Sequence, residues 1–149
     1  MIFSNSFATH LHALEAAGEE ARFEAYNRRA VELAVEATAE AGREDALVAA
    51  GVSYWSWRGD MPTADSMREA TRRQLSIMAE AGADIILLEM MIDLANFETT
   101  LDAVRGLGLP IWSGITTGRG PAGQKPQSEG GKLAPAQPLG KPGGGGQVT

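Results

Sequence analysis

The sequence predicts an α/β fold made of parallel strand–helix units. Short apolar runs alternate with longer segments in which apolar residues recur every three or four positions, as they do on one face of a helix. The run 84–91 is almost continuously apolar, which is typical of a parallel strand covered on both faces. Gly18, Gly42 and Gly82 follow the helical segments, at positions where helices commonly end.

The first third of the chain predicts a strand tail, two helices and a strand. Residues 2–3 are a short apolar start, and residues 8–17 and 19–41 favour helix. The second helix is expected to bury one stripe, formed by Phe23, Ala30, Leu33, Ala34, Ala37 and Ala41. Residues 46–52 have the length of a buried strand, although their small side chains also suit a helix.

The middle of the chain continues the alternation with a helix over 64–81 and strands over 84–91 and 110–115. Asp93 is the expected N-cap of a helix between these strands. The expected inner faces are Met67, Thr71, Leu75 and Met78 in the first helix, and Leu94, Phe97, Leu101 and Val104 in the second. The order implies parallel strands with right-handed crossovers. Both a small doubly wound sheet and an arc of a (β/α)8 barrel, which normally needs ~250 residues, fit it.

The composition changes sharply after Thr117. Residues 118–149 are rich in glycine and proline and contain few long apolar side chains. Such a segment cannot bury enough surface to offset its chain entropy, so we expect it to be a disordered tail. The folded domain is therefore expected over residues 1–117.

The bulk composition excludes several classes of function. The net charge is −6 and the estimated pI is 4.9, which does not suit a nucleic-acid binder. The absence of cysteine excludes disulfides, thiol nucleophiles and thiolate metal sites within these residues. No apolar run is long enough to span a membrane, and residues 1–14 lack the features of a signal peptide. Cytoplasmic residence is the default expectation.

Glu89 is the strongest candidate for a functional residue. It lies near the C-terminal end of the apolar run 84–91, where an unpaired carboxylate is costly and a partner or ligand is expected. Active sites of parallel barrels lie at the C-terminal ends of the strands. The structural alternative is an ion pair with a neighbouring Arg or Lys.

Asn5, between Ser4 and Ser6, ends the first apolar segment and is a second candidate. These polar residues are expected either to line the same strand-end face or to cap the following helix.

Three further motifs carry weaker signals. His10 and His12 form a His-x-His pair, but the chain has no third histidine and no cysteine, and positions i and i+2 of a helix point to different faces. Residues 118–123 match G-x-G-x-x-G, but no helix or acidic residue follows at the required place. The aromatic loop 54–57 is equally consistent with a ligand pocket and with a core or oligomer contact. We assign no metal ligand and no catalytic residue.

Several of these segments together resemble the homocysteine S-methyltransferase family. Residues 4–7 (Ser-Asn-Ser-Phe) resemble the Thr-Asn-Thr-Phe-type motif that ends the family's second strand. Residues 27–34 look like the family's helix segment that comes after this motif, and residues 81–89 are similar to its Ala-Gly-x-Asp-x-x-x-x-Glu strand. Residues 107–113 resemble the entry into its fifth strand, so the resemblance spans residues 4–117, about strands two to five.

The resemblance implies a (β/α)8 TIM barrel that transfers a methyl group to the sulfur of homocysteine, in methionine biosynthesis. It implies that Glu89 helps to hold the homocysteine amino group, with Asn5 and Ser113 at neighbouring strand ends. The family's zinc, which binds the homocysteine thiolate, is held by cysteines in the second half of the barrel, and this chain has no cysteine. We therefore expect a homocysteine-binding fragment that is catalytically incomplete by itself.

A partial barrel leaves open sheet edges. We therefore expect a homo-oligomer or a complementing chain that supplies the cysteines. A small α/β binding or assembly module without catalysis is the alternative. A gene fragment or a frameshift near residue 118 would explain both the partial barrel and the Gly/Pro-rich tail.

Overall fold

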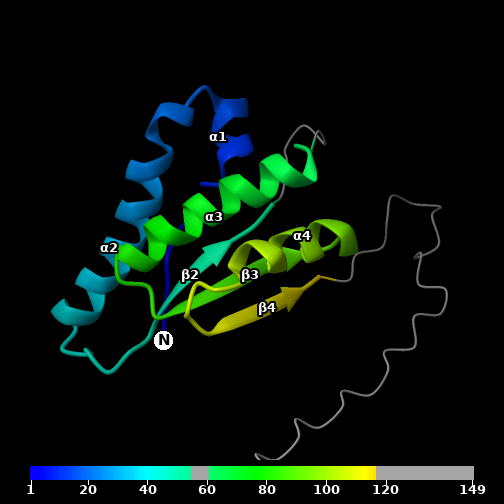
Figure 1. The fold of residues 1–149 in the computed structure, drawn as a ribbon. Helices are drawn as coiled ribbons and strands as arrows, with labels where there is room; N and C mark the ends of the chain where they lie inside the picture. The colour runs from blue at the N-terminus through cyan, green and yellow to red at the C-terminus, as the bar shows by residue number, and fades with distance from the viewer. Residues whose placement is uncertain (55–60, 117–149) are drawn as a thin grey trace, which may run out of the picture. The chain divides into compact units, whose positions relative to one another are not determined.

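The computed structural model describes residues 1–54 and 61–116, and it confirms the α/β class (Figure 1). Its elements in chain order are β1 (Ile2–Phe3), α1 (Leu11–Ala17), the 3₁₀ turn η1 (Glu20–Arg22), α2 (Phe23–Glu40), β2 (Val48–Val52), α3 (Ala64–Glu80), β3 (Ile85–Met91), α4 (Leu94–Val104) and β4 (Ile111–Ile115). Most of the aromatic loop, the G-x-G-x-x-G match and the expected tail lie outside the described residues.

The four strands form one parallel sheet in the order β1-β2-β3-β4. Each strand pairs with the next strand in the sequence, and α2, α3 and α4 connect the successive pairs. A doubly wound sheet reverses its strand order at a switch point. The described strands contain no such reversal, and their sheet is not closed.

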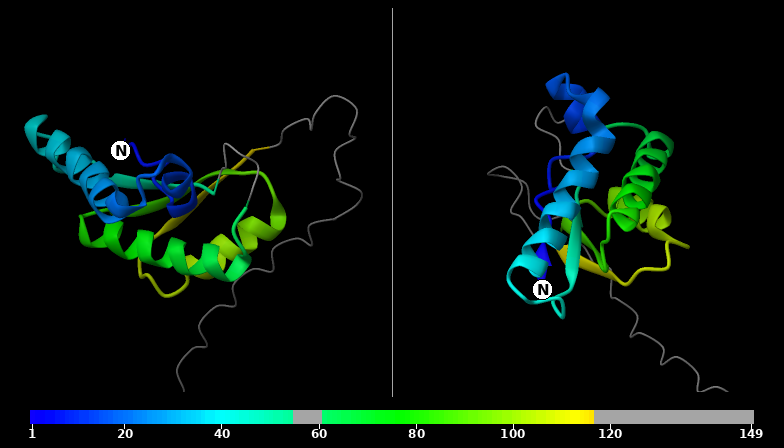
Figure 2. Two further views of the ribbon diagram at one scale, coloured as in Figure 1. Left: turned by 90° about the horizontal axis from the view of Figure 1, so that it is seen from above. Right: turned by 90° about the vertical axis from the view of Figure 1, so that its left-hand side faces the viewer.

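The hydrophobic core lies between one face of this sheet and the three connecting helices (Figures 1 and 2). The strands contribute alternate residues, which are Val48, Ala50 and Val52 of β2 and Ile86, Leu88 and Met91 of β3. The helices contribute Val31, Ala34, Met67, Leu75, Met78, Ala103 and Val104. All three connecting helices therefore cover the same face of the sheet, as right-handed crossovers between sequential neighbours require.

A β-bulge interrupts the alternation near the end of β3. Leu88 pairs with Ser113 and Met91 pairs with Ile115, so β3 has one residue more than β4 over this interval. Met90 takes a left-handed backbone with φ of 55°, which is unusual for a residue other than glycine. The extra residue lets Met91, rather than Met90, enter the helix-facing core.

The helical stripes were predicted with mixed success. In α3, Met67, Thr71, Leu75 and Met78 are all buried as expected. In α2 the buried residues are Phe23, Asn27, Val31 and Ala34, so only Phe23 and Ala34 of the expected stripe are confirmed as buried. Leu33, which was placed on the stripe, is 50% exposed. The apolar pattern missed this face because it omits Asn27, whose amide donates hydrogen bonds to two backbone carbonyls and accepts one from the Gln74 side chain.

None of the helices in residues 1–54 and 61–116 is long and apolar enough to cross a lipid bilayer. The cytoplasmic location stays a prediction.

Tyr54 joins the end of β2 to the loop between β3 and α4. Its ring is buried, and its hydroxyl accepts hydrogen bonds from the backbone N–H groups of Ile92 at 2.6 Å and Asp93 at 2.7 Å. Asp93 then caps α4 by accepting a hydrogen bond from Asn96 N–H, as its position in the sequence predicted. The loop that follows β3 is thus fixed by a side chain that lies two residues beyond the end of β2.

We expect Tyr54→Phe to lower the free energy of unfolding by about 1–2 kcal/mol, because two backbone N–H groups lose their acceptor. Urea denaturation followed by circular dichroism measures the loss. Tyr26→Phe is the matched control, since its hydroxyl donates to Glu19 near the surface, and we expect it to cost less than about 0.5 kcal/mol. Equal losses in the two variants would contradict a tethering role for Tyr54.

Candidate functional site

The candidate site lies at the C-terminal ends of β1, β2 and β3, which lie at the same end of the parallel sheet (Figure 1). β2 contributes Gly51, β3 contributes Glu89, and the segment after β1 contributes Ser4 and Ser6. The register pairs Gly51 with Leu87. Glu89 follows Leu87 by two residues, so both side chains lie on the same face of β3, opposite the helix-facing core.

Ser4 and Ser6 form a closed chain of hydrogen bonds with the backbone of Gly51. Gly51 N–H donates to the Ser4 hydroxyl at 3.2 Å, and the Ser6 hydroxyl donates to the Gly51 carbonyl at 2.7 Å. The two hydroxyl oxygens are 2.6 Å apart. Because the single proton of Ser6 is used on Gly51, Ser4 must donate to Ser6. Both serines are buried, and each of their hydroxyl groups takes part in two of these hydrogen bonds.

The carboxylate of Glu89 lies directly over Gly51. A Cβ atom added to Gly51 would be 2.6 Å from Glu89 Oε2 and 3.0 Å from its carboxyl carbon. Real Cβ atoms do not make contacts of this length, so only glycine leaves room for the carboxylate in this position.

Burial raises the pKa of the Glu89 carboxyl above its ordinary value. Within the described part of the chain, no hydrogen bond or ion pair holds the carboxylate. The structural alternative for Glu89, an ion pair with a neighbouring Arg or Lys, is therefore not realised among these residues. A half-buried carboxylate without a partner at a strand end is suited to binding a cationic or hydrogen-bond-donating group.

The other two residues proposed with Glu89 lie apart from it, Asn5 after the end of β1 and Ser113 in the middle of β4. Asn5 is exposed and lines a groove between β1 and α2, together with Phe3 and Leu33. Ser113 is exposed on β4 and pairs in register with Leu88. Since Leu88 faces the helices, Ser113 lies on the opposite face of the sheet from Glu89. The structure thus places Glu89 beside Gly51. That Asn5 and Ser113 belong to the same binding site as Glu89 stays a prediction.

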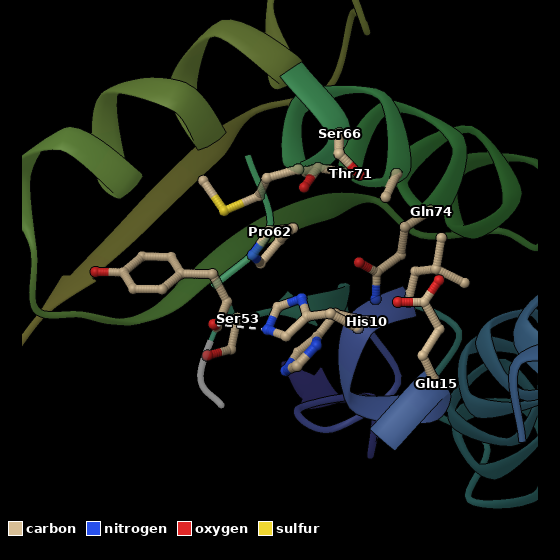
Figure 3. Close-up of a pocket in the computed structure, with 12 residues that line it drawn as sticks. His10, Glu15, Ser53, Pro62, Ser66, Thr71 and Gln74 are labelled. Atoms are coloured by element: carbon tan, nitrogen blue, oxygen red, sulfur yellow. Dashed lines mark hydrogen bonds between the residues drawn. The ribbon is translucent and has the colours of Figure 1, made fainter. Parts of the chain in front are cut away.

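A separate small cleft opens between α1, the end of β2 and the first turns of α3 (Figure 3). His10 and Ser53 lie on one side of it, and Ser66 and Thr71 of α3 lie on the other. On its wall, His12 Nε2 donates to the Tyr54 carbonyl at 3.0 Å. The cleft therefore borders the same end of β2 as the Glu89 site.

The two histidines stack instead of pointing to different faces. Their ring centroids are 4.0 Å apart, with an angle of 27° between the planes. The expectation for positions i and i+2 was wrong because His10 is the N-cap of α1, with an extended backbone, and only His12 is helical. In the described residues, no group of three or more His, Cys, Asp or Glu side chains could hold a metal ion.

Gly51 and the roles of the two serines were missed by the sequence interpretation. A glycine within an apolar strand is a known sign of close approach by another group, and this signal was present in residues 46–52. Ser4 and Ser6 were named only as neighbours of Asn5, yet they are the buried residues of that segment.

Comparison with known proteins identifies a family. The family model described as homocysteine S-methyltransferase matches residues 1–139, which is most of the 149-residue chain. No curated protein sequence matches the chain.

The raised pKa of Glu89 predicts a pH-dependent stability. Between the ordinary pKa of glutamate and the raised value, the folded state binds more protons than the unfolded state. The contribution of Glu89 to stability is therefore complete below the ordinary pKa and is lost as the pH rises through the raised one. Relative to wild type, Glu89→Gln should become more stable across this range, as measured by urea denaturation at a series of pH values.

Glu98→Gln is the control for this experiment, because Glu98 is an exposed residue of α4. We expect no such trend from it. A difference between Glu89→Gln and wild type that stays constant with pH would show that Glu89 is as well solvated as an ordinary surface carboxylate.

Proposed function

Because the chain belongs to the homocysteine S-methyltransferase family, we propose that residues 1–117 are a homocysteine-binding part of a (β/α)8 barrel, about strands two to five. Sequential order of the parallel strands, with α2, α3 and α4 on one face, supports this reading over a doubly wound sheet. On this proposal β3 is the fourth strand of the barrel, and residues 118–149 are a tail outside the folded domain.

The half-buried carboxylate of Glu89, which has no partner within residues 1–54 and 61–116, is the observation that carries the proposal. Homocysteine has an ammonium group, which would supply the partner that Glu89 does not find among the described residues. The pairing would offset the cost of leaving a half-buried carboxylate alone, and charge-assisted hydrogen bonds are among the stronger ones in proteins. On the basis of the family resemblance alone, we propose Asn5 as a further contact. Ser113, which the resemblance also implies, lies on the opposite face of the sheet from Glu89 and is left out of the proposed contacts.

The residues of this chain do not fit the zinc site of the family. In the family, zinc bound to cysteines activates the homocysteine sulfur as a nucleophile. These 149 residues contain no cysteine, and residues 1–54 and 61–116 contain no other cluster of three metal ligands. We therefore propose substrate binding, with no methyl transfer by the chain alone. A complementing chain that carries the cysteines would be needed for the reaction.

A binding or assembly role without homocysteine is the second candidate, and the sheet edges favour it. Phe3 on β1 is 52% exposed, while Trp112 and Ile115 on β4 are 48% and 68% exposed. Both edge strands therefore present apolar side chains to solvent, and a second copy or another chain would cover them.

The binding proposal predicts that the purified chain binds homocysteine in a calorimetric titration and that Glu89→Gln weakens binding at least about tenfold. The analogue 4-mercaptobutanoate, which lacks the amino group, should bind wild type more weakly, and Glu89→Gln should bind both ligands alike. Glu98→Gln is the charge-matched control and should behave as wild type. Discrimination between the ligands that survives in Glu89→Gln would assign the amino group to another residue. A folded wild type that binds neither ligand would favour the assembly role.

The proposal also predicts no methionine formation when the chain is supplied with homocysteine, zinc and S-methylmethionine. The expected reason is the missing set of thiolate ligands. Mass spectrometry of the product measures the outcome, with an intact member of the family as the positive control. Robust zinc-dependent methylation by this chain would refute it.

A further inference from the structure

The end of β1 continues its pairing with β2 through side chains instead of backbone. Ile2 N–H donates to the Leu47 carbonyl, and Ser4 N–H donates to the Ala49 carbonyl, as a regular parallel ladder requires. The next two bonds of such a ladder would run from Gly51 N–H to the Ser4 carbonyl and from Ser6 N–H to the Gly51 carbonyl. The hydroxyls of the same two serines occupy these positions.

The two serine hydroxyls thus hold the backbone of Gly51 at a point where the backbone of β1 no longer pairs with β2. Both polar groups of Gly51 are held by buried hydroxyls, and the hydroxyls are held by one another. On the β1 side, the Gly51 backbone thus has both of the hydrogen bonds that a continuing strand would supply. On the β3 side, the carboxylate of Glu89 lies within the space that a side chain at position 51 would need.

We propose that Gly51, clamped by Ser4 and Ser6, is a positioning residue for Glu89. Because Gly51 has no side chain, the carboxylate of Glu89 can lie against the backbone of β2 at this position. The two serines hold that part of the backbone in place. For ligand binding, this positioning role rests on the proposed function: the carboxylate would be held in one place, ready to bind the ammonium group of homocysteine. Gly51 itself need not touch the ligand.

Gly51→Ala tests this arrangement without a general loss of structure. The added methyl group would meet the end of a flexible side chain, the Glu89 carboxylate at 2.6 Å, so Glu89 is expected to swing away while the strand stays intact. Gly114→Ala is the matched control. It also adds a methyl group to a strand glycine, but its nearest neighbour would be the Leu88 carbonyl at an ordinary 3.6 Å.

The first readout is the pKa of Glu89, measured in the full chain by NMR of ¹³C-labelled glutamate carboxyl groups and assigned with Glu89→Gln. In wild type, burial raises this pKa. We expect it to fall toward the ordinary glutamate value in Gly51→Ala, because the carboxylate moves into solvent, and to stay unchanged in Gly114→Ala. A smaller shift in the same direction is expected for Ser6→Ala, which frees the Gly51 carbonyl.

The second readout is ligand affinity. Gly51→Ala should weaken homocysteine binding about tenfold or more. Its affinity for 4-mercaptobutanoate should stay at the wild-type level, because that ligand offers no ammonium group to Glu89. A merely structural role for Gly51 would weaken both ligands equally.

An unchanged Glu89 pKa in folded Gly51→Ala would overturn the positioning role. Should Gly51→Ala lose its circular dichroism spectrum, the Glu89 pKa in Ser6→Ala decides the question in the same way. Failure of wild type to bind homocysteine would refute the proposed function alone, since the NMR titration of Glu89 needs no ligand.

Discussion

The register between β2 and β3 is the constraint on which the candidate site depends. It sets Gly51 beside Leu87 and so brings Glu89, two residues further along, over the backbone of β2. A shift of one residue would turn Glu89 toward the helices and place an apolar side chain above Gly51. The burial of Ile86 and Leu88 against α3 and α4 prevents such a shift, so the hydrophobic core on one face fixes the polar geometry on the other.

The two faces of the sheet differ in what covers them. One face of the sheet is covered by three helices, and the core there is almost entirely apolar. The other face carries the carboxylate of Glu89, and the two edge strands expose Phe3, Trp112 and Ile115. A sheet of four parallel strands in sequential order has no reversal that would place helices on its second face. The helix-free second face and the exposed edge strands therefore follow from topology, and the proposed barrel or an assembly partner would cover the edges.

The sequence predicted the fold class and nearly all elements, because continuous apolar runs and helical periodicity report directly on burial. The ends of α1 and α2 were less accurate, since His10 and η1 depend on capping and local turns. The inner face of α2 was wrong at Asn27, because a pattern of apolar residues cannot identify a buried amide that is satisfied by Gln74. Glu89 was identified from its place in a strand. Gly51 was not, because its role depends on contacts between strands that no single segment encodes.

The costs to local stability are concentrated around Glu89, and this distribution supports a functional site there. Glycine weakens a strand interior, yet Gly51 occupies the middle of the sheet. A left-handed backbone is costly for a methionine, yet Met90 adopts it directly after Glu89. Burial of the carboxylate adds a third cost, since it raises the pKa of Glu89. The extra residue of the bulge lets Met91 rejoin the core beyond Glu89, so the apolar packing continues past a strand end that is built around one carboxylate.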